Sequence, residues 1–212
     1  MYEKVIKRLL DIVLSAFAIV FFALPMLVVA IIIKFDSPGP VLFKQRRIGI
    51  HKKEFIIYKF RSMPVNTPSN VATHQLDIDA IKLSRFQEFI RKSSIDELPQ
   101  IFNIFKGDIS IIGPRPALYN QDDLVAERDK YGANDVKPGL SGWAQINGRD
   151  ELEIPVKAKL DGEYVENLSF LFDLKCLLGT FISVIKSDGV VDGGTGKLEK
   201  LKKEKEEVTS AE

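Results

Sequence analysis

The chain has 212 residues, which is enough for one domain together with a membrane anchor. Its formal net charge of +1 excludes a general polyanion binder, and its single cysteine excludes an internal disulfide and a cysteine-rich metal cluster. The charge is uneven, because residues 1–61 hold eleven Lys and Arg against four Asp and Glu. A basic excess beside an apolar segment predicts contact with an anionic membrane surface and argues against nucleic acid as a partner.

The first predicted element is an apolar helix. Residues Ile12 to Ile33 form a run of 22 residues without a charge, which as a helix would measure about 33 Å, enough to cross a bilayer. Pro25, near the middle of the run, removes a backbone donor and favours a kink or break. Both flanks of the run are basic, so both prefer the cytoplasmic side. We expect a re-entrant anchor broken at Pro25, although length alone also fits a spanning helix.

A β-hairpin is predicted after the turn cluster at residues 36–40. Val41–Gln45 and Glu54–Phe60 have the character of two short strands joined by a turn. Lys59 lies on the second strand, both faces of which are largely apolar. A buried ammonium there needs a charged partner or a phosphate. The alternative is a lysine at the sheet edge that extends its ammonium into solvent.

Two helices are predicted next, over Ile78–Lys92 and from about Ser94 to Lys106. Adjacent carboxylates, Asp96 and Glu97, stand at the start of the second helix. Ser94 and Glu97 have the spacing of a capping box, and Asp96 could itself be an N-cap. Capping alone therefore explains both acids.

The same pair of acids also suits phosphate chemistry. The partial positive charge of a helix start favours an ionised carboxylate and a bound phosphate. An ionised Asp96 could attack phosphorus, and Mg²⁺ typically binds through one or two carboxylates together with substrate phosphates. Arg115 lies between two prolines, after a strand predicted over Ile109–Ile112. A guanidinium on so stiff a turn suits bidentate phosphate recognition.

The remaining candidate residues have weaker local signals. Arg149, in a polar run, is either a second phosphate ligand or a surface charge. Asp161, in a helix predicted over Glu151–Asn167 with an interruption near Pro155, reads by itself as a solvated surface acid. An apolar helix over Phe170–Lys186 is predicted to pack in the core or lie on the membrane surface.

Several motifs occur together in the chain. They are Lys-Arg-Leu-Leu-Asp before the apolar run, Pro25, and residues 45–49, 58–63, 91–100, 106–108, 113–116, 137–145 and 147–149. Taken together and in this order, they resemble the small monotopic polyprenyl-phosphate phosphoglycosyl transferases of bacteria, also called bacterial sugar transferases. One departure is Leu24, because the family commonly has Ser before the helix-breaking proline.

The residues and the resemblance together predict an α+β fold. We expect a re-entrant membrane helix–break–helix at residues 1–35. A small, mainly helical cytoplasmic domain with a short β-hairpin and amphipathic surface helices would occupy residues 36–189, and a disordered charged tail residues 190–212. The resemblance implies Asp96 as nucleophile and Mg²⁺ contact, with Glu97 as its partner. Further polar active-site positions implied for substrate or phosphate binding are Lys59, Arg91, Arg115, Arg149 and Asp161.

The function implied by the resemblance is Mg²⁺-dependent transfer of a phospho-sugar from a UDP-sugar to polyprenyl (undecaprenyl) phosphate. The reaction would proceed through a covalent aspartyl intermediate and release UMP, on the cytoplasmic face of the bacterial inner membrane. Two alternatives stay open at this point. One is a non-catalytic membrane-surface adaptor in which the acids only cap a helix, and the other is a membrane-bound nucleotide-sugar hydrolase.

Overall fold

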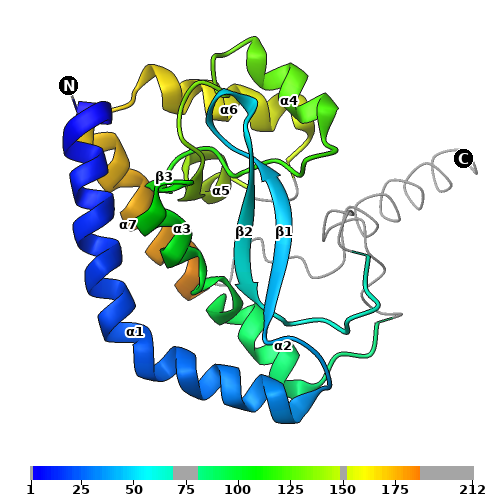
Figure 1. The fold of residues 1–212 in the computed structure, drawn as a ribbon. Coiled ribbons are helices and arrows are strands. Elements are labelled where there is room, and N and C mark those ends of the chain that lie inside the picture. The colour runs from blue at the N-terminus through cyan, green and yellow to red at the C-terminus, as the bar shows by residue number, and fades with distance from the viewer. Residues whose placement is uncertain (1, 69–80, 149–151, 187–212) are drawn as a thin grey trace, which may run out of the picture.

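The computed structural model describes residues 2–68, 81–148 and 152–186. Within these ranges the fold is α+β, with a long N-terminal helix, a β-hairpin and a group of shorter helices around a second small sheet (Figure 1). The predicted class and the predicted hairpin are therefore confirmed. The charged tail and Arg149 lie outside the described residues.

The N-terminal apolar segment forms one bent helix. A short π-helix, η1 (Tyr2–Lys7), leads into α1 (Arg8–Asp36). Helix α1 descends one edge of the molecule and then turns to run beneath it (Figure 1). Pro25 lies inside α1, and proline is the usual cause of a sharp bend in a helix. Since α1 continues through Pro25, the expected break takes the form of a bend.

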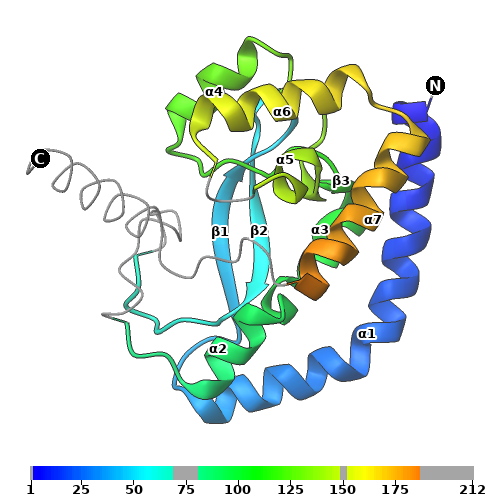
Figure 2. The same cartoon turned by 180° about the vertical axis from the view of Figure 1, so that it is seen from behind.

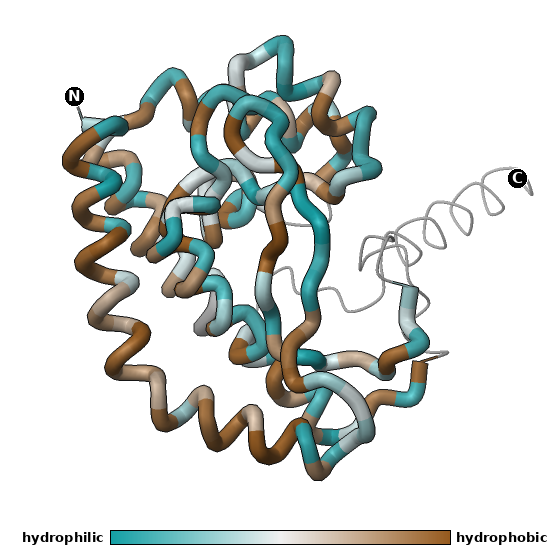
Figure 3. The backbone as a smooth tube through the Cα atoms, in the orientation of Figure 1, coloured by the Kyte–Doolittle hydropathy of each residue, from teal (hydrophilic) through white to brown (hydrophobic). Residues whose placement is uncertain are grey.

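Helix α1 is apolar along most of its length and exposes much of that surface (Figure 3). By length and composition, the helical stretch Tyr2–Asp36 could cross a membrane, and only 17% of its most apolar window is buried. Side chains of the outer face such as Val20 and Phe35 are 78% and 88% exposed. Apolar patches of this extent mark a surface that water does not normally cover.

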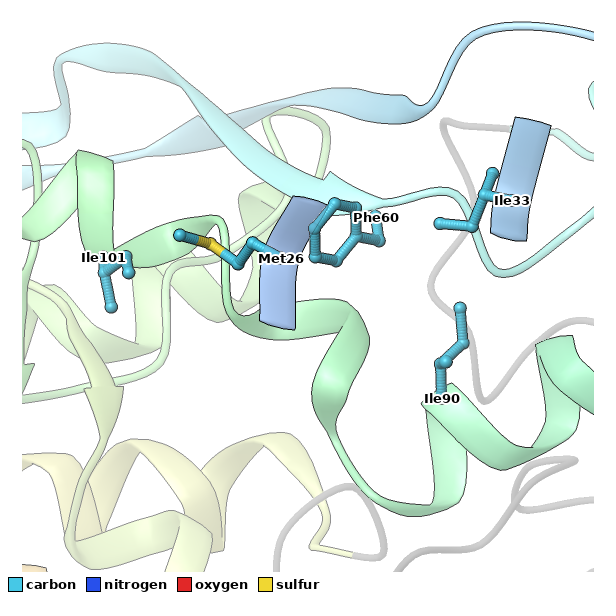
Figure 4. Packing of buried hydrophobic residues seen from close by; sticks show 5 residues of the cluster. All are labelled: Met26, Ile33, Phe60, Ile90 and Ile101. Atoms are coloured by element: carbon cyan, nitrogen blue, oxygen red, sulfur yellow. The ribbon is translucent and has the colours of Figure 1, made fainter. Parts of the chain in front are cut away.

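The inner face of α1 builds a core with the elements around the site. Met26 and Ile33 of α1 pack with Phe60, Ile90 and Ile101 (Figure 4). These three partners come from β2 (Glu54–Phe60), α2 (Arg85–Lys92) and α3 (Gln100–Lys106). Burying such side chains stabilises the fold by roughly 1.5–3 kcal/mol each, so the core fixes α1 against the strand and helices that carry the site.

The hairpin pairs β1 (Leu42–Ile48) with β2 in antiparallel register, from Leu42 opposite Phe60 to Ile48 opposite Glu54. Strand β2 has the predicted bounds, whereas β1 extends three residues beyond Gln45. The connecting 3-10 turn η2 (Ile50–Lys52) includes His51 in the left-handed region, with φ of 53°. The hairpin thereby places Phe60, the neighbour of Lys59, in the core beside Ile33 of α1.

A second layer supports the turn that carries Arg115. Strand β3 (Ser110–Ile112) pairs in parallel with β4 (Gly139–Ser141), for which no strand was predicted. Gly142 is required there, because a Cβ on it would lie 2.1 Å from the carbonyl oxygen of Gly113. The helices of this layer are α4 (Asp122–Asp129), α5 (Trp143–Ile146), α6 (Ile154–Glu166) and α7 (Phe170–Lys186) (Figure 2).

Helices α2 and α6 each differ from prediction, α2 in where it begins and α6 in being uninterrupted. Helix α2 begins at Arg85, where Ser84 and Gln87 form a reciprocal capping box with two 3.1 Å bonds. The expected start at Ile78 lies outside the described residues. Pro155 stands in the first turn of α6 and does not interrupt it, because a first-turn residue needs no backbone donor.

Both ends of α1 are fastened to the same globular part. At its start, the guanidinium of Arg8 donates to the carbonyl oxygens of Ile104 and Phe105 of α3, each at 2.8 Å. At its end, the guanidinium of Arg61 donates to the carbonyl oxygens of Ser37 and Pro38, each at 2.7 Å. The Arg8 bonds satisfy carbonyls that the end of α3 leaves without partners, and the Arg61 bonds hold the chain that follows α1.

Candidate active site

The two adjacent acids lie in a tight turn ahead of α3. Ser94 has φ of 55° and ψ of 18° and makes no side-chain cap, and the 3-10 turn η4 (Ile95–Glu97) follows it. The expected capping box of Ser94 with Glu97 is therefore wrong. Asp96 is not an N-cap either, because it lies inside η4 and Pro99 precedes α3. Neither carboxylate is needed to begin the helix.

Glu97 is instead the meeting point of two cations. Its Oε1 accepts from Lys59 Nζ at 2.7 Å and from Arg115 Nη2 at 2.9 Å. Lys59 comes from β2 and Arg115 from the turn after β3, so residues distant in sequence converge here. The side chains of Lys59 and Glu97 are only 16% and 20% exposed. The prediction that Lys59 needs a charged partner is confirmed, and the solvent-extended alternative is wrong.

Asp96 has a different environment. It is 9% exposed, and its Oδ2 accepts a 3.2 Å hydrogen bond from the Ser62 hydroxyl. Burial raises the pKa of Asp96 from an ordinary 3.8 to about 6. Lys59 and Arg91 oppose that rise, and the neighbouring charge of Glu97 adds to it. Burial thus outweighs the effect expected from a helix start.

The pKa of Glu97 moves in the opposite direction. Burial alone would raise it, but the charges of Lys59 and Arg115 and their hydrogen bonds hold the pKa of Glu97 below its usual range. With both acids ionised, three cations (Lys59, Arg91 and Arg115) face two carboxylates. The resulting positive excess suits an incoming phosphate.

Asp161 lies behind this cluster. It is 1% exposed, and its Oδ2 accepts from Arg128 Nε at 2.8 Å and from Arg128 Nη2 at 2.6 Å. The same Nη2 donates to the carbonyl oxygen of Arg115 at 3.0 Å. The solvated-acid alternative for Asp161 is wrong, and the buried pair supports the Arg115 turn from behind.

Three supporting residues were not identified as candidates from the sequence. Ser62 was part of a recognised motif, and a hydroxyl two residues after a strand gave no further signal. Arg128 lies in a helix of polar composition, which is typical of a surface. Arg47 of β1 donates to the carbonyl oxygen of Pro116 at 2.9 Å, a contact between segments that only the folded chain brings together.

The donor set at the two acids fits a magnesium ion shared with a substrate. The described residues contain no group of three or more His, Cys, Asp and Glu side chains that could hold a metal alone. Mg²⁺, however, commonly uses one or two carboxylates and takes its other ligands from substrate phosphates and water. Asp96 and Glu97 supply such carboxylates beside cations that suit phosphate.

The fold and site combine a long, exposed apolar helix with a carboxylate pair that is flanked by cations. A profile of the bacterial sugar transferase family matches residues 2–187. The chain belongs to this family, as the motifs predicted. The apolar helix α1 fits a membrane-associated enzyme of the family.

Named relatives extend the comparison. The chain is 40% identical over 186 residues to the uncharacterized sugar transferase EpsL of Bacillus subtilis, covering 88% of this chain and 90% of EpsL. It is 39% identical to a UDP-N-acetylgalactosamine-undecaprenyl-phosphate N-acetylgalactosaminephosphotransferase of Aeromonas hydrophila. It is 36% identical to a UDP-glucose:undecaprenyl-phosphate glucose-1-phosphate transferase of Escherichia coli. These two matches each cover 87% of this chain but only 44% and 40% of the longer relatives.

Proposed function

We propose that this protein transfers a phospho-sugar from a UDP-sugar to undecaprenyl phosphate, with Asp96 as the covalent nucleophile. The observation that carries the proposal is the convergence of Lys59 and Arg115 on Glu97, directly beside a buried Asp96. The printed activities of the Aeromonas and Escherichia relatives support the same class of donor and acceptor.

In the first step, a carboxylate oxygen of Asp96 attacks the phosphorus attached to the sugar. A new oxygen–phosphorus bond forms, the bond to the bridging oxygen of the diphosphate breaks, and UMP leaves with that electron pair. Lys59, Arg91 and Arg115 would bind the phosphate oxygens on which negative charge accumulates. Glu97 holds two of these cations in place beside the nucleophile.

In the second step, a phosphate oxygen of undecaprenyl phosphate attacks the same phosphorus. The Asp96 carboxylate leaves, and undecaprenyl diphosphate-sugar is the product. Mg²⁺ held by Asp96, with Glu97 alongside, would neutralise phosphate charge and orient the donor.

We also propose that α1 is re-entrant and holds the site at the cytoplasmic face of the inner membrane. A spanning helix places its ends on opposite sides of the bilayer. Here Arg8 binds carbonyls of α3 at one end of α1, and Arg61 binds the chain at the other. This arrangement favours one side for both ends, as do the basic flanks. Leu24, which is 69% exposed, occupies the lipid-facing side of the bend in this topology.

UMP release tests the proposed activity. Purified protein in detergent is given a panel of UDP-sugars, with and without undecaprenyl phosphate and Mg²⁺. We expect multiple-turnover UMP release only when one of the sugars, the acceptor and Mg²⁺ are all present. Full turnover without the acceptor would establish the hydrolase instead. If no UMP is released with any donor, the proposed activity is wrong and the non-catalytic membrane-surface adaptor is favoured.

A further inference from the structure

We propose that Arg47 and the Arg128–Asp161 pair are positioning residues that aim Arg115 at the site. The inference rests on the proposed function, because Arg115 is there a phosphate ligand. It also assigns Asp161 a task other than direct contact with substrate. The inference is carried by two contacts to the Arg115 turn. Arg128 of α4 donates to the carbonyl oxygen of Arg115, and Arg47 of β1 donates to the next carbonyl oxygen, that of Pro116.

The first support comes from α4 and α6. Arg128 is 4% exposed and Asp161 is 1% exposed, and two bonds of 2.8 and 2.6 Å fix the guanidinium on the carboxylate. With its plane fixed in this way, Nη2 also reaches the Arg115 carbonyl oxygen at 3.0 Å. One planar fork thus joins a buried acid to the backbone of an active-site residue, which a lysine ammonium reproduces poorly.

The second support comes from β1. Arg47 donates through Nε and Nη2 to Gln45 Oε1, at 2.9 and 2.6 Å, and through Nη1 to the Pro116 carbonyl oxygen at 2.9 Å. The backbone N–H of Ile48 donates to the Ala117 carbonyl oxygen at 2.9 Å. The hairpin therefore holds the chain immediately after Arg115 while Arg128 holds Arg115 itself.

The turn leaves Arg115 few other ways to move. Pro114 and Pro116 restrict the backbone on both sides. With two carbonyls held, the backbone from which the Arg115 side chain extends is fixed, and the Nη2 of that side chain donates to Glu97 at 2.9 Å. Displacing a binding group by about 1 Å can cost on the order of a hundredfold in rate. Stability alone is a weak reason for such a pair, since apolar replacements of buried ion pairs are often neutral or stabilising.

A double-mutant cycle tests the inference. Values of kcat/KM are measured for wild type, Arg128→Lys, Arg115→Ala and the double variant, with thermal unfolding recorded for each. We expect Arg128→Lys to lower kcat/KM on the order of tenfold to a hundredfold. In the Arg115→Ala background the same change should cost less than about twofold, because there is no side chain left to position.

A second cycle covers the case in which Arg128→Lys fails to fold. Arg47→Lys, on a partly exposed strand, takes the place of Arg128→Lys in this cycle. We again expect the substitution to lower kcat/KM in the wild-type background and to have little effect on kcat/KM in the Arg115→Ala background. The control is Lys52→Met, which removes an exposed ion pair between the hairpin turn and Asp129 of α4. We expect it to leave kcat/KM unchanged.

Equal losses in both backgrounds would overturn the inference and give these arginines a role independent of Arg115. An unchanged kcat/KM for both Arg128→Lys and Arg47→Lys would overturn it as well. An inactive wild type would instead remove the proposed function, so the two failures are distinguishable.

Discussion

Asp96 and Glu97 are neighbours in the chain, yet their pKa values move in opposite directions. Asp96 is buried with a serine hydroxyl on one oxygen, whereas Glu97 receives an ammonium and a guanidinium on one oxygen. Burial without full compensation raises a carboxyl pKa, and direct pairing lowers it. Such divergence of two adjacent acids is typical of sites where the acids have different tasks.

The first prediction concerns the pH dependence of Asp96. In the metal-free protein, with a pKa of about 6, about a tenth of Asp96 is ionised at pH 5 and about nine-tenths at pH 7. Since the ionised form is the nucleophile and bound Mg²⁺ also favours that form, UMP release in a single turnover without acceptor should rise with pH to a plateau, with a midpoint at or below pH 6. A rate that falls steadily between pH 5 and pH 8, or a midpoint above pH 7, would contradict this role.

The second prediction concerns stability at the same residue. A pKa raised on folding means that the contribution of Asp96 to stability is fully present below pH 3.8 and is lost as pH rises through about 6. The loss corresponds to about 3 kcal/mol. Asp96→Asn lacks this loss, so its free energy of unfolding should exceed that of wild type increasingly between pH 4 and pH 7. Denaturant unfolding at several pH values measures it, and a variant less stable than wild type at pH 7 would show that the ionised Asp96 carboxylate stabilises the fold.

At the scale of elements, α1 is held by a buried ion pair as well as by apolar packing. The ammonium of Lys7, at the start of the helix, pairs with the Asp173 carboxylate of α7, and both side chains are at most 10% exposed. Asp173 also accepts from the hydroxyls of Tyr2 and Tyr164. Removing one partner of a buried pair leaves an uncompensated charge.

The third prediction follows from that pair. Asp173→Asn should lower the free energy of unfolding by about 3–5 kcal/mol, because Lys7 then remains buried without a counter-charge. Asp135→Asn is the matched control, since its pair with His51 is 60% and 73% exposed and such pairs contribute about 0–1 kcal/mol. Equal effects of the two variants in denaturant unfolding would show that the buried pair does not hold α1.

The hydrophobic pattern of the sequence predicted those helices and strands that a contiguous stretch of residues specifies by itself. The continuous apolar run predicted α1, alternating strand character predicted β2, and the spacing of apolar residues predicted α7. Strand β4 was missed because its three residues pair with β3 across the fold, and nothing in Gly139–Ser141 indicates a strand. Ser94 was misread as a cap because its left-handed backbone depends on tertiary contacts of the turn.

The candidate site was predicted more fully than the elements around it. The motifs singled out Lys59, Asp96, Glu97 and Arg115, and the structure brings these four together. The buried Arg128–Asp161 pair was unpredictable from local sequence, because each partner lies in a helix of mixed polarity and only their contact removes both from water.

At the scale of the whole molecule, the fold joins the exposed apolar helix α1 and the proposed phosphate site in one body. The core of Met26, Ile33, Phe60, Ile90 and Ile101 joins the second half of α1 to the strand that carries Lys59 (Figure 4). An acceptor with a lipid tail and a phosphate head needs both surfaces within reach of one another. The packing of this core therefore sets the distance between α1 and the side chains of the candidate active site.

The fourth prediction concerns the topology of α1 in a membrane. Single cysteines at Lys4→Cys and Pro40→Cys, in a Cys176→Ala background, should both react with an impermeant thiol reagent only from the cytoplasmic side of oriented membrane vesicles. The positions flank α1 and are exposed. Labelling from opposite sides would establish a spanning helix and contradict the re-entrant anchor.

The covalent role of Asp96 is tested most directly by peptide mass spectrometry of the quenched enzyme. Protein is mixed with its UDP-sugar and Mg²⁺ in the absence of undecaprenyl phosphate, quenched within the first turnover and digested. We predict a mass increase of one phospho-sugar on the peptide that contains Asp96, its disappearance when undecaprenyl phosphate is added, and no increase for Asp96→Asn. Turnover by the wild type with no adduct at any time, or an adduct that persists in Asp96→Asn, would contradict the mechanism.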